Sequence, residues 1–353
     1  MKKTLLALAA IAATSASFAQ SSVSLYGVVD ASLESVKGSD NTVSRVSSDN
    51  LATSRLGFKG TEDLGGGLKA NFVLETALKS DTGAQGNSAR FFDRAAWAGL
   101  AGGFGELRLG RIDSSIGLLA GNTSLLGAQG YDDLRIADTF ASNKYRRLDN
   151  AVTYLLPTLV KGLSAQVQYS TQADSTVTGG ESYGNDRGKT WGFNVAYAAD
   201  GIVAGLGYVN GKANASGSIK DTGALVYAGY DFSVAKLTGY YNMDKTTDAE
   251  EIRRLVGVRL DVPVSKEFAV QASVAKVKNT TLTTRGDDDN ATIVALKGVY
   301  SLSKRTTLVA NVAYLKNSSS ATEALVNTTS GAIGGGVAGT SQTSVALGVR
   351  HIF

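Results

Sequence analysis

The chain contains no cysteine, one histidine and two prolines in 353 residues. Without cysteine it can form neither disulfides nor thiolate metal sites, and one imidazole excludes catalytic or metal clusters that need two. Its 35 basic and 31 acidic side chains nearly balance, so no strong positive field indicates nucleic-acid binding. We therefore expect no metal, no cofactor and no nucleic-acid partner.

Long apolar runs are also missing, apart from a short one near the N-terminus. Lys2 and Lys3 precede an apolar segment from Leu5 to Ala13, and Ser17-Phe18-Ala19 fits a small-residue cleavage site. That segment is too short to span a bilayer as a helix. We expect residues 1–19 to be a signal peptide and residues 20–353 to form one exported domain.

What the sequence does contain is alternation with a period of two residues. In SSVSLYGVVDASLE, Val23, Leu25 and Val29 share one face of a strand, and Ser24, Tyr26 and Asp30 share the other. Similar segments recur down the chain and predict sixteen strands, an even number. They are expected near residues 22–34, 54–62, 68–78, 91–100, 104–111, 150–157, 162–171, 189–199, 201–211, 221–232, 234–245, 250–263, 266–278, 290–302, 305–316 and 341–353.

The connections between these strands alternate between short turns and long polar segments. The long ones are residues 35–53, 79–90, 112–149, 172–188, 279–289 and 317–340. Such asymmetry is typical of outer-membrane barrels, which have short periplasmic turns and long external loops. The two prolines, Pro157 and Pro263, lie at strand ends, as a closed hydrogen-bonded sheet requires. A soluble sandwich or propeller, whose strands also alternate, is the rival fold.

The chain ends in VALGVRHIF, in the middle of an alternating segment. Val345, Leu347, Val349 and His351 share a face with Phe353, which places Phe353 in the lipid-facing row. A barrel closes by pairing its last strand with its first and so leaves no open edge. We expect Phe353 to take part in that closure.

Several separate blocks of the sequence resemble one family. SSVSLYGVVD, SRLGFKGTEDLGGGLKANFVLE, GFGELRLGR, YSLSKRT and GVRHIF occur in the order typical of the trimeric general-diffusion porins of the beta-proteobacterial outer membrane. The resemblance covers residues 20–353. It implies a homotrimer in outer-membrane lipid and lipopolysaccharide, and a terminal aromatic residue that the outer-membrane assembly machinery reads. It also implies a third external loop that folds into the barrel.

The resemblance further implies a pore constriction between a basic wall and an acidic loop. By motif, the wall residues are Arg55 in TSRLGFKG, Arg94 in FFDRAAWAGL and Arg147 in YRRLDNAVTY, with Lys59 and Arg108 added by strand parity. The loop, residues 112–149, carries Asp132, Asp133 and Asp138 in YDDLRIADTF. The choice between Arg146 and Arg147 stays open.

Strand parity offers a separate test of the wall residues. Leu56 and Phe58 point to lipid, which turns Arg55 and Lys59 inward, and Leu107 and Leu109 do the same for Arg108. Ala95, Trp97 and Gly99 are predicted to point outward and Arg94 inward. The alternative for each arginine is a solvated side chain, or one that pairs with Asp93 or Asp149 to stiffen the wall.

The sequence leaves three candidate functions open. A water-filled channel for passive diffusion of ions and small hydrophilic solutes needs only charges in the lumen and an ordered constriction, and is expected to be weakly anion-selective. A barrel enzyme would need a nucleophile and base, yet the one histidine faces lipid. A substrate-selective or adhesive barrel is the third possibility.

Three consecutive acidic residues, Asp287, Asp288 and Asp289, lie in a predicted loop between two strands. They predict either a solvated loop tip or a surface site for a divalent cation.

Overall fold

The computed structural model describes residues 22–39, 41–123, 125, 146–171, 188–214, 216–247, 251–280, 290–325 and 336–353. The predicted signal peptide, the carboxylates Asp132, Asp133 and Asp138, and the aspartates 287–289 lie outside these ranges. Within them, no helix is long and apolar enough to cross a membrane.

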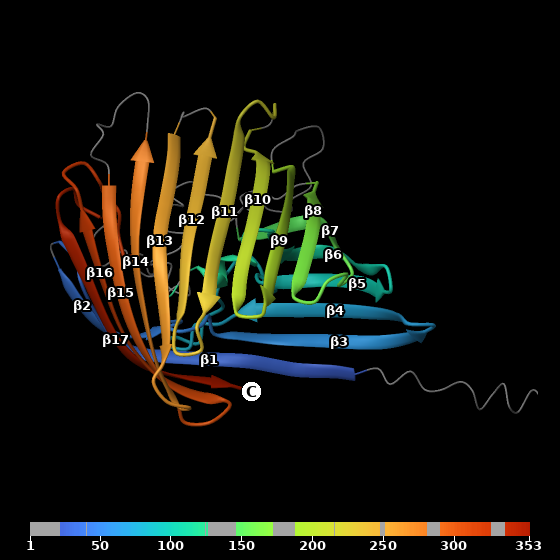
Figure 1. The fold of residues 1–353 in the computed structure, drawn as a ribbon, viewed down its shortest axis with the longest axis horizontal. Coiled ribbons are helices and arrows are strands. Elements are labelled where there is room, and N and C mark those ends of the chain that lie inside the picture. The colour runs from blue at the N-terminus through green and yellow to red at the C-terminus, as the bar shows by residue number, and fades with distance from the viewer. Residues whose placement is uncertain are drawn as a thin grey trace, which may run out of the picture.

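The chain folds into one closed antiparallel sheet (Figure 1), with neighbouring strands joined in sequence order and β1 paired to β17. The labelled strands are β1 (Ser22–Lys37), β2 (Thr42–Ser48), β3 (Arg55–Gly65), β4 (Leu68–Ala77), β5 (Ala95–Gly102), β6 (Gly105–Asp113), β7 (Arg147–Leu155), β8 (Leu163–Ser170), β9 (Thr190–Ala199), β10 (Ile202–Lys212), β11 (Lys220–Asp231), β12 (Lys236–Thr246), β13 (Glu251–Pro263), β14 (Phe268–Thr280), β15 (Asn290–Ser301), β16 (Thr306–Asn317) and β17 (Ser341–Ile352). A short 3₁₀ helix, η1, covers Ala120–Asn122.

In the described part of the chain, seventeen labelled strands make sixteen barrel strands. β1 pairs along its first half with β3, from Ser22↔Thr61 to Val28↔Arg55, and along its second half with β2, from Ala31↔Ser48 to Lys37↔Thr42. β2 and β3 are therefore two parts of one barrel strand, separated by residues 49–54. The prediction of sixteen strands is confirmed, with boundaries close to those expected from alternation.

One predicted loop is wrong. Residues 35–53 were expected to form a polar connection, yet β1 continues to Lys37 and β2 returns from Thr42, with the Gly38 N–H donating to Asn41 O at 2.8 Å. The alternation of side chains continues through this hairpin, but polar residues occupy both faces. A sheet that extends beyond the lipid needs no apolar outer row. The apolar residues on the outer face therefore stop before the strand itself ends, and the sequence pattern placed the strand end too early.

Side-chain polarity is inverted relative to a water-soluble protein. Large apolar side chains are exposed on the outer face, among them Leu33 at 67% and Leu347 at 60%, while Asp30, Asn194 and Asn311 are buried on the inner face. Transfer of an apolar outer surface from water to lipid is favourable by about 25 cal/mol per Å². The barrel thus requires an apolar environment around it, which a soluble sandwich does not.

Phe353 lies at the seam where the barrel closes. Its N–H donates to Gly27 O and its carbonyl accepts from Gly27 N–H, both at 3.1 Å. The ring covers Gly27, because a Cβ at that glycine would overlap it. The C-terminus accordingly lies beside β1 (Figure 1), and the predicted pairing of first and last strands is confirmed.

Candidate functional site

The inside of the barrel is divided into an apolar side and a charged side. On the inner face of β10 to β16, Val209, Leu225, Leu255 and Ile293 are buried in one cluster. Ile116, Leu119 and Leu125, which follow β6, pack against them, as do Ala321 and Leu325, which follow β16. Burial of each large apolar side chain contributes about 1.5–3 kcal/mol. These contacts hold two connecting segments inside the barrel.

Polar contacts fix the first of these segments, the described part of residues 114–125. The Asn194 side-chain amide donates to Ser115 O at 2.7 Å, and the Ser115 hydroxyl donates to Gln168 Oε1 at 2.7 Å. Further along, Arg259 donates to Gly121 O at 3.4 Å and Lys297 Nζ donates to Leu125 O. The described start of the predicted third external loop therefore folds into the lumen, as expected.

A cavity of about 460 Å³ lies between this inward segment and the opposite wall. Among the described residues, five cationic side chains line it, together with a single carboxylate, Asp113. The cations are Arg55, Arg94, Arg146, Arg259 and Lys297. Gly117, Leu118 and Gly121 form one side of the cavity, and Leu51, Ala52 and Thr53, from between β2 and β3, form part of the other. We call this space the constriction cavity.

Arg55 and Arg94 share one carboxylate, Glu75 on β4. Arg94 Nε lies 2.5 Å from Glu75 Oε1, and Arg55 Nε lies 3.5 Å from Oε2. The Tyr26 hydroxyl also donates to Oε2, at 2.9 Å. Two guanidinium groups around one carboxylate leave a net positive charge, so this cluster presents cationic side chains to the lumen and holds them in place.

The position of Arg94 does not follow from the parity argument. Trp97 was predicted to face lipid together with Ala95 and Gly99, but the centre of its ring lies 4.3 Å from Arg108 Cζ, on the lumen side. This row of β5 therefore faces inward, and the prediction is wrong. Small residues occupy both faces of β5 around the tryptophan, so the strand offers no polarity contrast. Arg94 itself precedes the strand, where alternation does not apply.

The other arginines near the end of β6 form their own ion pairs. Arg147 Nε lies 3.2 Å from Asp113 Oδ1, and Arg146 lines the constriction cavity beside it. Asp149 receives Arg90 Nη1 at 2.7 Å and also pairs with Arg111. The sequence also allowed the predicted wall arginines to pair with Asp149. In the structure the arginines that pair with Asp149 are Arg90 and Arg111.

Lys59 and Arg108 lie away from the constriction cavity. Both line a second cavity of about 360 Å³, on the inner face nearer the short turns. Arg108 Nη2 lies 2.7 Å from Glu106 Oε2, and Lys59 Nζ lies 5.2 Å from the centre of the Tyr26 ring. The predicted wall residues are therefore divided between two levels of the lumen.

Sequence reasoning missed Arg259, Lys297 and Glu75 as site residues. Alternation places their side chains on the inner face, because their neighbours in the sequence point outward. Val258 and Leu260 flank Arg259, and Leu296 precedes Lys297. Parity alone could have found them as lumen residues. Their convergence on the lumen region around Arg55 depends on closure of the barrel.

No grouping suited to a metal ion occurs in the described ranges. No three His, Cys, Asp or Glu side chains there gather around a point that could hold a metal. His351 lies on the outer face, where its Nδ1 is 2.9 Å from the Thr306 hydroxyl. The functional groups that the described lumen residues present are mainly fixed charges.

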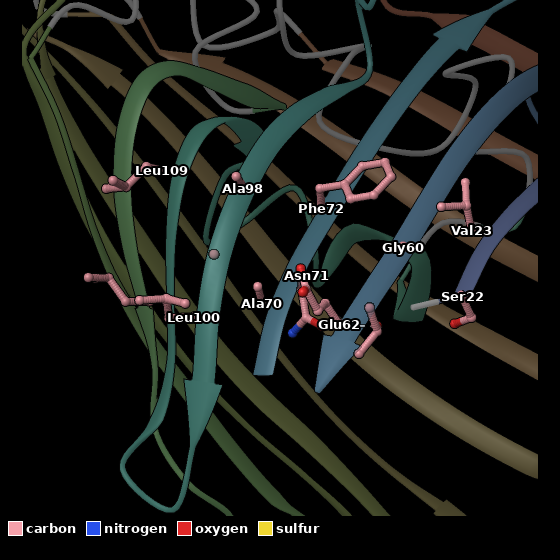
Figure 2. Close-up of a pocket in the computed structure, with 13 residues that line it drawn as sticks. Ser22, Val23, Gly60, Glu62, Ala70, Asn71, Phe72, Ala98, Leu100 and Leu109 are labelled. Atoms are coloured by element: carbon pink, nitrogen blue, oxygen red, sulfur yellow. Dashed lines mark hydrogen bonds between the residues drawn. The ribbon is translucent and has the colours of Figure 1, made fainter. Parts of the chain in front are cut away.

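The outer face carries a separate apolar hollow of about 610 Å³ over β1 and β3 to β6. Figure 2 shows Leu100, Leu109, Ala98 and Phe72 around it, with Val23 on the far side. Large exposed apolar surfaces mark contacts with lipid or with another protein.

Comparisons with known proteins agree with this geometry. The Gram-negative porin family profile matches residues 5–320. Outer membrane porin protein 32 of Delftia acidovorans is 35% identical over the full length of both chains, and an outer membrane porin protein of Bordetella pertussis is 28% identical over the same extent. The solved anion-selective porin from Comamonas acidovorans superposes with a TM-score of 0.79 at 31% identity, over 95% of this chain and all of that one. Closed barrel, charged lumen and sequence together place the chain in the Gram-negative porin family, as a channel of the outer membrane.

Proposed function

We propose that the channel passes small anions and hydrophilic solutes by passive diffusion, with a preference for anions set at the constriction cavity. The observation that carries this proposal is the excess of cations there, five against one carboxylate among the described lining residues. Two further carboxylates outside the lining pair with these cations, Glu75 with Arg94 and Asp261 with Arg259, and the cations still outnumber the carboxylates. Fixed charges lining a narrow pore raise the local concentration of the opposite ion and repel ions of like sign. The similarity to a porin described as anion-selective supports the same preference.

Each predicted wall residue has a proposed part in this preference. Arg55 and Arg94 act directly at the constriction cavity, with Glu75 fixing their positions. Arg147 stays paired with Asp113 and lowers the negative charge of that lining carboxylate. Lys59 extends the positive potential toward the short turns, while Arg108 beside it is paired with Glu106. The carboxylates Asp132, Asp133 and Asp138 lie outside the described residues, and their proposed position opposite the wall rests on the family resemblance.

The test is the reversal potential of single channels in a planar bilayer under a potassium chloride gradient. The wild type is expected to favour chloride, and Arg55→Ala/Arg94→Ala to move the reversal potential toward the potassium value. Arg305→Ala, which removes a positive charge at an exposed short turn, is the control and should leave the reversal potential unchanged. Equal shifts in both variants, or a wild type that favours potassium, would refute the proposal.

We also propose a homotrimer, surrounded by outer-membrane lipid and lipopolysaccharide and inserted by the assembly machinery that recognises Phe353. The trimer rests on the family resemblance, and the outer hollow on β1 and β3 to β6 is its proposed contact surface. Leu100→Trp should fill the hollow and yield monomers in detergent. Leu237→Trp, at an equally exposed outer position on β12, should leave the trimer intact. A Leu100→Trp trimer of unchanged mass would exclude this surface.

A further inference from the structure

The second lumen cavity, of about 360 Å³, combines cations with aromatic rings. Its floor is one row across adjacent strands, formed by Ser24, Lys59, Val73 and Trp97, which are successive partners from β1 to β5. Arg108 on β6 lies diagonally next to Trp97. A solute that leaves the constriction cavity toward the short turns passes this row.

The two cations of this cavity differ in how far they are neutralised. Within the described ranges Lys59 makes no ion pair or hydrogen bond through its ammonium group, and its nearest noted partner is the Tyr26 ring at 5.2 Å. Arg108 is balanced by Glu106, whose other oxygen accepts from the Asn71 side chain at 3.1 Å. The cavity therefore keeps a positive charge at Lys59.

Apolar and aromatic surfaces stand beside that charge. Val73 separates Lys59 from Trp97 in the row, and the Trp97 ring packs against the buried cluster of Ile112, Leu148 and Ala151. Arg108 covers the Trp97 ring at 4.3 Å, a distance typical of a cation–π contact. An inorganic anion needs none of these surfaces. A planar organic anion uses both the charge and the apolar floor.

We propose that this cavity is a transient binding subsite for aromatic carboxylates. The carboxylate pairs with Lys59, and the ring lies over Val73 beside the Trp97–Arg108 stack. The cavity volume falls within the range of small-molecule sites. The proposal rests on the proposed anion pore, since aromatic carboxylates must first enter the lumen.

The alternative is that the two cation–ring contacts only stiffen the wall. Each such contact would then stabilise the barrel without affecting which solutes bind in the lumen. The two possibilities differ in one measurable property: only a subsite distinguishes a planar aromatic carboxylate from a saturated ring of the same charge.

The experiment measures block of single-channel chloride current by benzoate, cyclohexanecarboxylate and acetate, each added to the side of the short turns. For the wild type we expect benzoate to block at concentrations about fivefold below those of cyclohexanecarboxylate, the factor typical of one aromatic pair. Acetate should not block in that range. Lys59→Met should abolish benzoate block, Lys59→Arg should restore it, and Trp97→Leu should remove the difference between the two rings.

Lys69→Met serves as the control, because Lys69 shares the inner face of β4 with Val73 but lies outside the cavity. It should keep wild-type block by benzoate. Equal block by all three carboxylates in the wild type would overturn the proposed subsite. So would an equal loss of benzoate block in Lys69→Met and Lys59→Met. Failure of the anion pore is recognised separately, by a potassium-selective reversal potential measured without any carboxylate.

Discussion

Asp30 is the residue on which the shape of one side of the constriction cavity depends. Its carboxylate is buried and accepts three backbone N–H groups, from Asn50 at 2.9 Å, Leu51 at 3.0 Å and Ala52 at 2.9 Å. These residues belong to the 49–54 segment that separates β2 from β3. The next carbonyl, of Thr53, accepts from Arg55 Nη1 at 3.2 Å. Asp30 thus positions the cavity rim and, through it, a wall cation.

Asp30→Ala removes all three acceptors. Hydrogen bonds to a charged group contribute about 1.5–3 kcal/mol each, and they are not additive when water can reach the freed donors. The free energy of local opening of residues 49–54 should therefore fall by about 3–5 kcal/mol. This corresponds to an increase in backbone hydrogen exchange of about a hundredfold or more. Asp30→Asn keeps one carbonyl acceptor and should show an intermediate increase.

The assay is hydrogen exchange followed by mass spectrometry on peptides that cover residues 45–58, together with the reversal potential of the same preparations. Asp231→Asn, which weakens a carboxylate contact to Ser233 N–H in a distant exposed turn, is the control. Asp30→Ala should raise exchange only in the 45–58 peptides and weaken anion preference through the displaced Arg55. Wild-type exchange in those peptides would refute the positioning role, whatever happens to the current.

Three other changes test separate parts of the structure. Gly27→Leu should displace the ring of Phe353 and the backbone carbonyl of Arg55, because a Cβ at Gly27 would overlap both, and should lower the temperature at which the barrel unfolds on heat-modifiability gels. An unchanged temperature would show that the close packing at Gly27 does not support the seam. Glu323→Gln removes the negative charge from the buried contact with Arg253 and should increase hydrogen exchange across residues 318–325; exchange at the wild-type rate would contradict it. Lys297→Met removes one lining cation and the contact to Leu125 O, so the reversal potential should move toward potassium, and a value identical to the wild type would exclude Lys297 from selectivity.

Alternation of side chains determined most of the barrel from the sequence alone. A strand exposes successive residues to opposite faces, so lipid on one side and water on the other leave a local pattern that needs no partner strand to interpret. Arg55 and Arg108 were placed on the lumen face in this way. The same argument placed Phe353 in the outer row. The structure agrees with the predicted number of barrel strands and with the predicted pairing of the first and last strands.

Tertiary structure decided what alternation could not express. Trp97 was misplaced because alanines on both sides of it gave no contrast, and only its pairing with Val73 and Gly110 showed which way it faces. Arg259 and Lys297 reach the same cavity as Arg55 because the sheet closes, although they lie far away in sequence. A local period determines the face of each residue, whereas convergence across a lumen depends on the register and closure of the entire sheet.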